Sequence, residues 1–202
     1  MKVHATAKRP YTMRARATAT AATRRRLLEA ATGLFAERFW DEVTLEDVAG
    51  RAGVSVQTLI RHFGTRDGLL TAAADDLRAV IESQRDRAPV GDLEADVRNL
   101  VDHYEEWGEP AALRLLAQEE RDPVIAAIAQ SGRAMHREWV ERVFAPLLER
   151  RSGAERRRLL ARLVATCDVY FWKVLRRDMG LSRRETERAI LEAVRAAARS
   201  GC

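Results

Sequence analysis

Apolar side chains recur at the three- and four-residue spacing of an amphipathic helix along nearly the whole chain after residue 24. The first such stripe predicts a helix that begins at Arg24 and ends between Arg38 and Asp41. No segment alternates convincingly between apolar and polar residues, and no internal repeat is evident. The pattern therefore predicts an all-α protein. The apolar positions of the first helix are Leu27, Leu28, Ala31, Leu34, Phe35 and Phe39.

Two short helices joined by a tight turn are predicted next. Thr44, followed three residues later by Asp47, matches a capping box at the start of the first of them. Gly53 stands at the turn, where glycine adopts a positive φ at little cost. Ser55 suits the N-cap of the second helix, residues 56–63. A helix, a tight turn and a second helix are the layout of a helix-turn-helix DNA reader.

The longer remainder of the chain also has a helical pattern. Capping boxes are predicted where Ser152 precedes Glu155 and where Ser182 precedes Glu185. Asp122 and Pro123 suit an N-cap and a first-turn proline, and Pro146 should kink or end the helix that they open. The predicted helices cover residues 66–85, 93–107, 111–120, 123–150, 154–178 and 183–199.

Three regions follow from this pattern. Residues 1–22 lack hydrophobic periodicity and are predicted to form a disordered basic arm. Residues 23–86 are predicted to form a three-helix helix-turn-helix domain with the helix that follows it. Pro and Gly in residues 87–91 suggest a junction, after which residues 91–202 form a helical C-terminal domain.

Positive charge is concentrated at the N-terminal end. Of the net charge of +5, residues 1–66 carry 12 Lys and Arg against 6 Asp and Glu, whereas residues 67–202 carry 23 against 24. Such asymmetry points to a polyanion at that end, nucleic acid being the usual one. A solvated basic tail explains the charge alone equally well.

Composition narrows the class of protein. Hydrophobic residues make up 47% of the chain, yet no apolar run approaches the roughly 20 residues that span a bilayer. The basic start lacks the apolar segment of a secretory signal, and a transit peptide fits less well. Cys167 and Cys202 do not form a disulfide framework, so a reducing, cytoplasmic setting is expected.

The helix-turn-helix segment resembles the DNA-binding domain of the tetracycline-repressor (TetR) family. The chain departs from that family at Ile60, where an aromatic residue is usual and touches the DNA backbone, and at Phe39, where glycine is usual. Arg66 replaces a family lysine and keeps its charge. The resemblance rests on Leu28, Ala30, Ala31, Leu34, Phe35, Thr44, Asp47, Val48, Ala49, Ala52, Gly53, Val54, Ser55, Thr58, Leu59, His62, Phe63, Asp67, Leu69 and Leu70.

DNA-binding roles follow from position in such a domain. Residues near the N-terminal end of a recognition helix reach base edges, which favours Gln57 and Thr58 as base readers. Thr44, Arg61, His62 and Arg66 fit phosphate contacts, which set the register without reading the sequence. For His62, packing within the domain is the alternative role. Arg24, Arg25 and Arg26 are further candidates for phosphate contacts. The arm is expected either to follow the DNA backbone or enter a minor groove, or to remain a solvated tail. The candidate DNA-binding residues are Thr44, Ser55, Gln57, Thr58, Arg61, His62 and Arg66.

The resemblance implies a C-terminal domain that binds a small-molecule effector and forms a homodimer through the last two helices. Apolar stripes on these helices are consistent with a four-helix bundle between two chains, and burial within one chain is the competing interpretation. The stripes consist of Leu159, Leu160, Leu163, Val164, Cys167, Phe171 and Val174, followed by Ile190, Leu191, Val194 and Ala198.

A ligand pocket is harder to place. Aromatic and apolar residues with a few polar tips suit a small-molecule site, and an ordinary core explains each of them as well. His103 and His136 are isolated from other metal ligands, and no nucleophile elbow or Gly-rich phosphate loop is present, so neither a metal site nor an enzyme is predicted. The candidate pocket residues are Tyr104, Trp107, Leu116, Met135, Trp139 and Tyr170.

The sequence therefore predicts a transcription regulator that binds double-stranded DNA without a cofactor or a membrane. Family resemblance favours a repressor that leaves a palindromic operator when a ligand binds. A helical small-molecule-binding or enzymatic protein with a non-functional head is one alternative. A ligand-independent regulator controlled by a protein partner is another.

Overall fold

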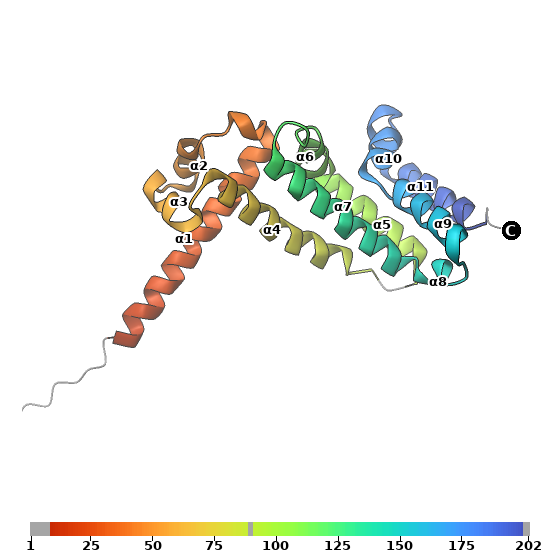
Figure 1. Cartoon of the computed structure of the whole chain (residues 1–202), viewed down its shortest axis with the longest axis horizontal. Coiled ribbons are helices and arrows are strands. Elements are labelled where there is room, and N and C mark those ends of the chain that lie inside the picture. The colour runs from red at the N-terminus through yellow and green to blue at the C-terminus, as the bar shows by residue number, and fades with distance from the viewer. Residues whose placement is uncertain (1–8, 89–90, 200–202) are drawn as a thin grey trace, which may run out of the picture. The chain divides into compact units, whose positions relative to one another are not determined.

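The computed structural model of this 202-residue chain describes residues 9–88 and 91–199. Within these ranges every regular element is a helix and no strand is present (Figure 1). The predicted all-α fold is therefore confirmed. Residues 1–8, which belong to the predicted arm, and Cys202 lie outside the described ranges.

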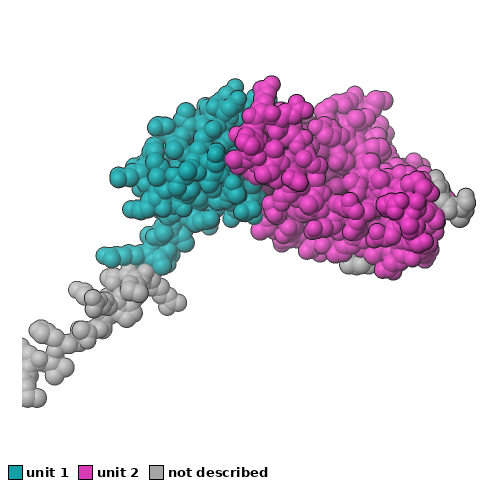
Figure 2. Space-filling view, in the orientation of Figure 1, with its two compact units in different colours: residues 1–76 teal, residues 77–202 magenta. Residues whose placement is uncertain are grey.

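The chain divides into two compact units, Met1–Asp76 and Leu77–Cys202 (Figure 2). The division falls inside helix α4, Arg66–Arg85, and not at the junction expected at residues 87–91. Residues 69–87 contain neither Gly nor Pro, so nothing in the sequence ends the helix where the first unit ends. The predicted domain of residues 23–86 therefore extends past the first unit, and α4 belongs to both units.

The first unit contains a bundle of helices around the predicted helix-turn-helix. Helix α1 covers Arg9–Glu37, the 3₁₀ helix η1 covers Trp40–Glu42, α2 covers Leu45–Ala52 and α3 covers Val56–Phe63. The predicted bounds of the recognition helix are confirmed. The buried side chains of this unit include Leu27, Leu28, Ala31, Leu34, Trp40, Val48, Ala49, Leu59 and Leu69.

Helix α1 is longer than expected, because it begins at Arg9 and not at Arg24. The prediction of a disordered arm is wrong for residues 9–22. Residues 11–32 contain no Gly or Pro and are rich in Ala, which has the highest helix propensity. Extending an existing helix is far easier than starting one, so this stretch continues the packed part of α1 without an apolar stripe. Figure 1 shows α1 running well past α2 and α3.

The second unit consists of the end of α4 and the helices that follow it. Two of its segments, η2 and η3, are π-helices. The elements are α5 Leu93–Trp107, η2 Gly108–Leu113, α6 Arg114–Leu116, α7 Pro123–Val143, α8 Ala145–Leu148, α9 Gly153–Thr166, α10 Val169–Lys173, η3 Val174–Asp178 and α11 Arg183–Arg199.

Several helix boundaries in the second unit differ from the prediction. Ser152 makes no capping hydrogen bond, and Glu155 instead pairs with Arg151 at 2.5 Å, so that capping box is not formed. The helix expected over residues 154–178 is interrupted, because Asp168 accepts a hydrogen bond from the backbone N–H of Tyr170 and starts α10. Most of the helix expected over 111–120 is replaced by η2 and the short α6.

Other predicted helix starts are confirmed. The carboxylate of Asp122 accepts from the backbone N–H groups of Val124 and Ile125, and Pro123 opens α7. Ser182 and Glu185 form the expected capping box before α11. Helix α7 ends at Val143, ahead of Pro146, which lies in the first turn of α8.

The apolar stripes of the last two helices mostly face the interior of the chain itself. Leu163 and Val194 are fully buried, and Ile190 is 1% exposed. These side chains belong to the same core as α5 and α7. The competing interpretation of the stripes, burial within one chain, therefore holds for these residues, and they are not available to a second copy.

Candidate nucleic-acid interface

The turn between α2 and α3 is built from local hydrogen bonds. The backbone N–H of Asp47 donates to the hydroxyl of Thr44, and the N–H of Thr44 donates to the carboxylate of Asp47, so the predicted capping box is formed. The latter bond is the main reason that the pKa of Asp47 lies below its usual range. Gly53 ends α2 at φ 66°, a conformation that side chains rarely adopt. Thr44 is therefore exposed but occupied in capping.

Helix α3 starts at a second cap, which involves two of the candidate DNA-binding residues. The hydroxyl of Ser55 accepts a hydrogen bond from the backbone N–H of Thr58 at 3.2 Å. The two hydroxyl oxygens of Ser55 and Thr58 lie 3.0 Å apart and form a further hydrogen bond. Both hydroxyls are thus used inside the helix start, which leaves the methyl group of Thr58 as its more available part.

One face of α3 is open to solvent. Gln57 and Arg61 are exposed, and Ile60 is 45% exposed, at the three- and four-residue spacing that places side chains on one side of a helix. Leu59 is fully buried on the opposite side. His62 is half-buried with its ring 6.0 Å from that of Phe63. The open face is therefore formed by an amide, an aliphatic side chain and a cation.

Arg66 makes contacts within the first unit. Its Nε donates to the carbonyl of Val43 at 3.1 Å, a terminal nitrogen donates to the carbonyl of Trp40, and its guanidinium lies 5.0 Å from the centre of the Trp40 ring. Arg66 is half-buried, and Trp40 is fully buried. The side chain predicted to contact phosphate thus fastens α4 to η1.

Two arginines of α1 lie at the two ends of α3. The guanidinium of Arg24 lies 5.2 Å from the centre of the Phe63 ring, at the last residue of α3. A terminal nitrogen of Arg26 lies 3.9 Å from the place a Cβ on Gly53 would occupy, at the turn before α3. Arg25 pairs with Glu29 at 3.3 Å. The sequence alone does not place these arginines against α3, because their position depends on how α1 packs.

Two acidic residues near the helix-turn-helix, Glu37 and Asp47, are paired with other arginines. Arg38 pairs with Asp47 at 2.8 Å, and Arg51 pairs with Glu37 at 2.7 Å. The charge of Arg51 holds the pKa of Glu37 below its usual range, chiefly through this hydrogen bond. Within residues 15–76, Arg24, Arg26 and Arg61 show no ion pair, so positive charge remains around α3.

The candidate pocket residues of the second unit differ in burial, and one of them lines an apolar groove. Tyr104 and Trp139 are buried in the core, with exposures of 4% and 3%. Trp107, Leu116 and Met135 are half-buried, and none of them lines the groove found in this unit. Tyr170 does line it and is 52% exposed. Of the six candidate residues, Tyr170 therefore belongs to this groove, and the assignment of the other five to a ligand site stays a prediction.

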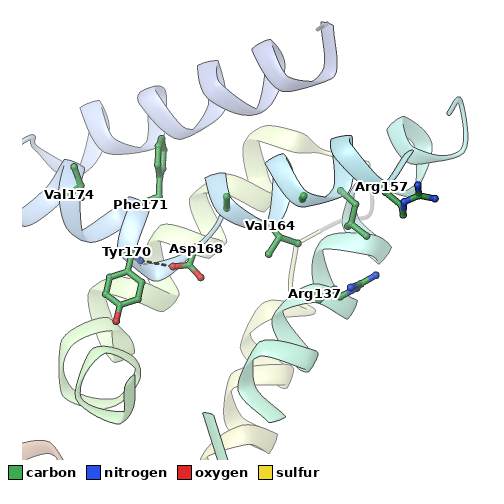
Figure 3. A pocket seen from close by; sticks show the side chains of 10 residues that line it. Arg137, Arg157, Val164, Asp168, Tyr170, Phe171 and Val174 are labelled. Atoms are coloured by element: carbon green, nitrogen blue, oxygen red, sulfur yellow. Dashed lines mark hydrogen bonds between the residues drawn. The ribbon is translucent and has the colours of Figure 1, made fainter. Parts of the chain in front are cut away.

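An apolar groove lies between α7, α9 and the segment from α10 to η3 (Figure 3). Its volume is about 810 Å³. Asp168 lies within it, and two arginines, Arg137 and Arg157, stand toward one end. The lining residues are Arg137, Arg157, Leu160, Ala161, Val164, Ala165, Asp168, Tyr170, Phe171 and Val174.

The described residues contain neither a cluster of metal-ligand side chains nor a helix that could span a membrane. No three His, Cys, Asp or Glu side chains lie together as metal ligands within 9–88 and 91–199. In the same part of the chain, no helix is both long and apolar enough to cross a membrane. Cys167 is buried, and burial raises the pKa of its thiol to about 12.

Residues 27–73 match the family model described as "Bacterial regulatory proteins, tetR family". An HTH-type transcriptional repressor of Mycobacterium tuberculosis is 45% identical over 51 residues, which are 25% of this chain and 27% of that protein. An HTH-type transcriptional regulator of Mycobacterium bovis matches to the same extent. The matched segment thus spans about a quarter of these relatives. Residues 27–73 are therefore similar to the domain that this family model describes.

Solved structures extend the similarity of fold to most of the chain. A transcriptional regulator from Rhodococcus sp. RHA1 has a TM-score of 0.68 at 19% identity, over 86% of this chain and 95% of its own. A putative TetR-family regulator from Rhodococcus sp. has a TM-score of 0.65 at 20% identity, over 88% of this chain and 99% of its own. The helical second unit therefore has the fold found in such regulators.

Proposed function

We propose that the protein is a dimeric transcription regulator that binds a palindromic operator through helix α3. The observation that carries this proposal is the open face of α3, with Gln57, Ile60 and Arg61 exposed, between Arg24 and Arg26 of α1. Residues 27–73 are similar to a TetR-family domain, and in that family a face of this kind reads DNA. A cytoplasmic location is part of the same proposal.

Gln57 is the base reader in this proposal. It is the second residue of α3 and exposed, and a glutamine amide can form a two-point contact with adenine. Ile60 suits an apolar contact, for example with a thymine methyl group, in place of the aromatic backbone contact usual in the family. Arg24, Arg26 and Arg61 supply phosphate contacts, which fix the register of the helix in the groove.

A two-fold dimer is required because a single helix-turn-helix offers few contacts, and two copies read two half-sites. We place the contact between copies on the groove, not on the buried stripes. Tyr170 and Val174 are 52% and 48% exposed there, and the alanines Ala161 and Ala165 permit close approach of another helix. A two-fold contact is self-complementary, so the basic end and Asp168 of the same groove can pair between copies.

Control by a small-molecule effector is the second part of the proposal. A ligand weakens operator binding only if it favours a conformation in which the two reading heads are wrongly spaced. Helix α4 gives a continuous route, since its first residue, Arg66, is fastened to η1 and its last, Arg85, is buried in the second unit. Repression is the role named for the relative from M. tuberculosis, an HTH-type transcriptional repressor.

The test is binding of purified protein to the DNA upstream of its own gene, compared with random duplex. Gln57→Ala should weaken binding to the specific site by about 1–3 kcal/mol and leave binding to random duplex nearly unchanged. Gln130→Ala, at an exposed glutamine of α7, is the matched control and should bind as the unaltered protein does. An equal loss on all duplexes would refute base reading by Gln57.

The same measurement addresses the alternatives. A protein with a non-functional head should show no preference between the upstream duplex and random duplex. A ligand-independent regulator should show the preference but should not release the duplex when small molecules that raise its melting temperature are added, since a tight ligand must raise that temperature.

A further inference from the structure

Arg85, the last residue of α4, is a buried positive charge. Its exposure is 5%, and a guanidinium stays protonated in any protein environment. Across residues 9–88 and 91–199, it forms no ion pair with a carboxylate, and its Nε has no hydrogen-bond partner. A buried charge without a counter-ion lowers the free energy of unfolding. The presence of Arg85 here therefore needs either a compensating group or a function such as binding an anion.

Aromatic rings hold the guanidinium but do not neutralise it. Its central carbon lies 5.0 Å from the centre of the Trp139 ring and 5.9 Å from that of Tyr104. Its Nη1 lies 3.3 Å from Nδ1 of His136. Cation–π contacts of this kind leave the net charge in place. Arg85 also influences His103 and Cys167, and neither is an anion at neutral pH.

The two histidines beside Arg85 are neutral. Burial and then the charge of Arg85 lower the pKa of His103 to about 2 and that of His136 to about 4. Since Arg85 donates to Nδ1 of His136, the ring proton is on Nε2, which donates to the carbonyl of Val164 at 3.2 Å. His136 therefore links Arg85 to α9.

Unused donors surround this charge. Nε1 of Trp139 is buried without a hydrogen-bond partner, as is Nε of Arg85. Asp168 also influences His136 and Tyr104, and one of its carboxylate oxygens accepts from the backbone N–H of Tyr170. The cluster thus combines a buried guanidinium, which makes no ion pair, with donors that lack acceptors.

We propose that Arg85, Trp139 and His136 form the recognition site for an anionic effector, a small organic carboxylate that accepts from Arg85 and from the indole of Trp139. This inference rests on the proposed control by an effector and names its chemical class. Binding replaces the contact of Arg85 with His136, and His136 also holds the carbonyl of Val164, a residue that lines the groove. The ligand therefore alters the position of a residue in the groove where we place the second copy.

The experiment is thermal unfolding of the full chain with acetate, benzoate and octanoate, each compared with a neutral counterpart (acetamide, benzamide and octanamide) at equal ionic strength. At least one carboxylate should raise the melting temperature, and its amide should not. Inorganic phosphate separates carboxylate recognition from binding of any anion. If no carboxylate exceeds its amide, or if phosphate has the same effect, the proposal is overturned.

Arg85→Met tests the residue itself. Removal of an uncompensated buried charge should raise the melting temperature of the ligand-free protein, and the carboxylate concentration needed for half the effect should rise at least tenfold. Arg85→Lys keeps a charge and should retain a weaker response. A lower melting temperature for Arg85→Met with an unchanged carboxylate response would overturn the proposal.

Arg188→Met is the matched control, since Arg188 is exposed and pairs only with Glu192 on its own helix. It should respond to carboxylate as the unaltered protein does. None of these measurements contains DNA. A carboxylate response without preference for a specific duplex would therefore refute the DNA-binding role alone, and the opposite result would refute the anion site alone.

Discussion

Two arginines of the first unit that look alike in sequence have opposite roles in the structure. Arg66 bonds to the carbonyl groups of Trp40 and Val43, whereas Arg24 lies over Phe63 and makes no ion pair within residues 15–76. A guanidinium that satisfies buried carbonyl groups contributes to stability. One that stands free beside α3 can contribute to the attraction of phosphate.

Arg66→Met should therefore destabilise the protein by about 1–3 kcal/mol, because the carbonyl groups lose their donor. Denaturant unfolding measures this loss. Where the variant is folded, the slope of log Kd against log salt should match that of the unaltered protein, since no phosphate contact is removed. A shallower slope with unchanged stability would restore Arg66 as a phosphate contact.

Arg24→Gln and Arg26→Gln should show the reverse. Each should lower the magnitude of the salt slope by about 0.9, the value for one phosphate contact in B-form DNA. Stability should change by less than about 0.5 kcal/mol, as for most surface substitutions. Arg188→Gln in the second unit is the control. An unaltered slope for both variants would leave α1 without a part in binding.

The sequence predicts the roles of some of these side chains but not of all of them. The periodicity of α3 puts Gln57 and Arg61 outward, which needs only the helix itself. The role of Arg66 depends on its contact with Trp40, which lies 26 residues earlier in the chain. A local sequence pattern does not predict such a contact. Arg85 shows the same limit, because an arginine in the last turn of a helix usually meets the helix dipole in solvent.

At the scale of elements, the helix starts that the sequence predicts correctly are those with a side-chain cap. The starts at Asp122 and Ser182 are specified by a residue and its own near neighbours. The π-helices η2 and η3 were not predicted, since an apolar stripe does not distinguish their winding from that of an α-helix. The length of α1 was missed for a related reason, because alanine extends a helix without a stripe.

Two serines with the same sequence motif provide a test of capping. Ser182 accepts from the backbone N–H of Glu185, whereas Ser152 makes no side-chain cap bond. Ser182→Ala should therefore lower the free energy of unfolding by about 1 kcal/mol. Ser152→Ala should change it by less than about 0.5 kcal/mol. Equal losses in urea unfolding would show that both boxes form in solution.

The whole molecule should lose stability in acid because of its buried histidines. His103 and His136 have pKa values lowered from 6.5 to about 2 and about 4, mainly by burial. Below pH 6.5 the unfolded chain binds protons that the folded chain excludes, so the free energy of unfolding falls as pH drops. Asp96 opposes this, since burial raises its pKa from 3.8 to about 6 and the folded chain then binds the proton first.

Two histidines outweigh one carboxyl group, so the net loss between pH 6 and pH 4 should be about 1 kcal/mol per pH unit. Asp96→Asn should steepen this loss and should raise stability at pH 7 by about 1–2 kcal/mol, allowing for screening by solvent. Urea unfolding at several pH values measures both effects. Stability that rises from pH 6 to pH 4 would contradict the assignment of neutral histidines.

The association of two chains that we propose uses the groove surface, which is distinct from the buried core. Ile190 is 1% exposed within one chain, so Ile190→Ala should cost about 2–4 kcal/mol of stability and leave the oligomeric state unchanged. Tyr170→Asp should dissociate the proposed dimer with little loss of stability, because Tyr170 is 52% exposed on the groove. Val80→Asp, on α4 at 49% exposure, is the control and should remain dimeric. Sedimentation velocity distinguishes these outcomes, and a dimer that persists in Tyr170→Asp would place the contact away from the groove.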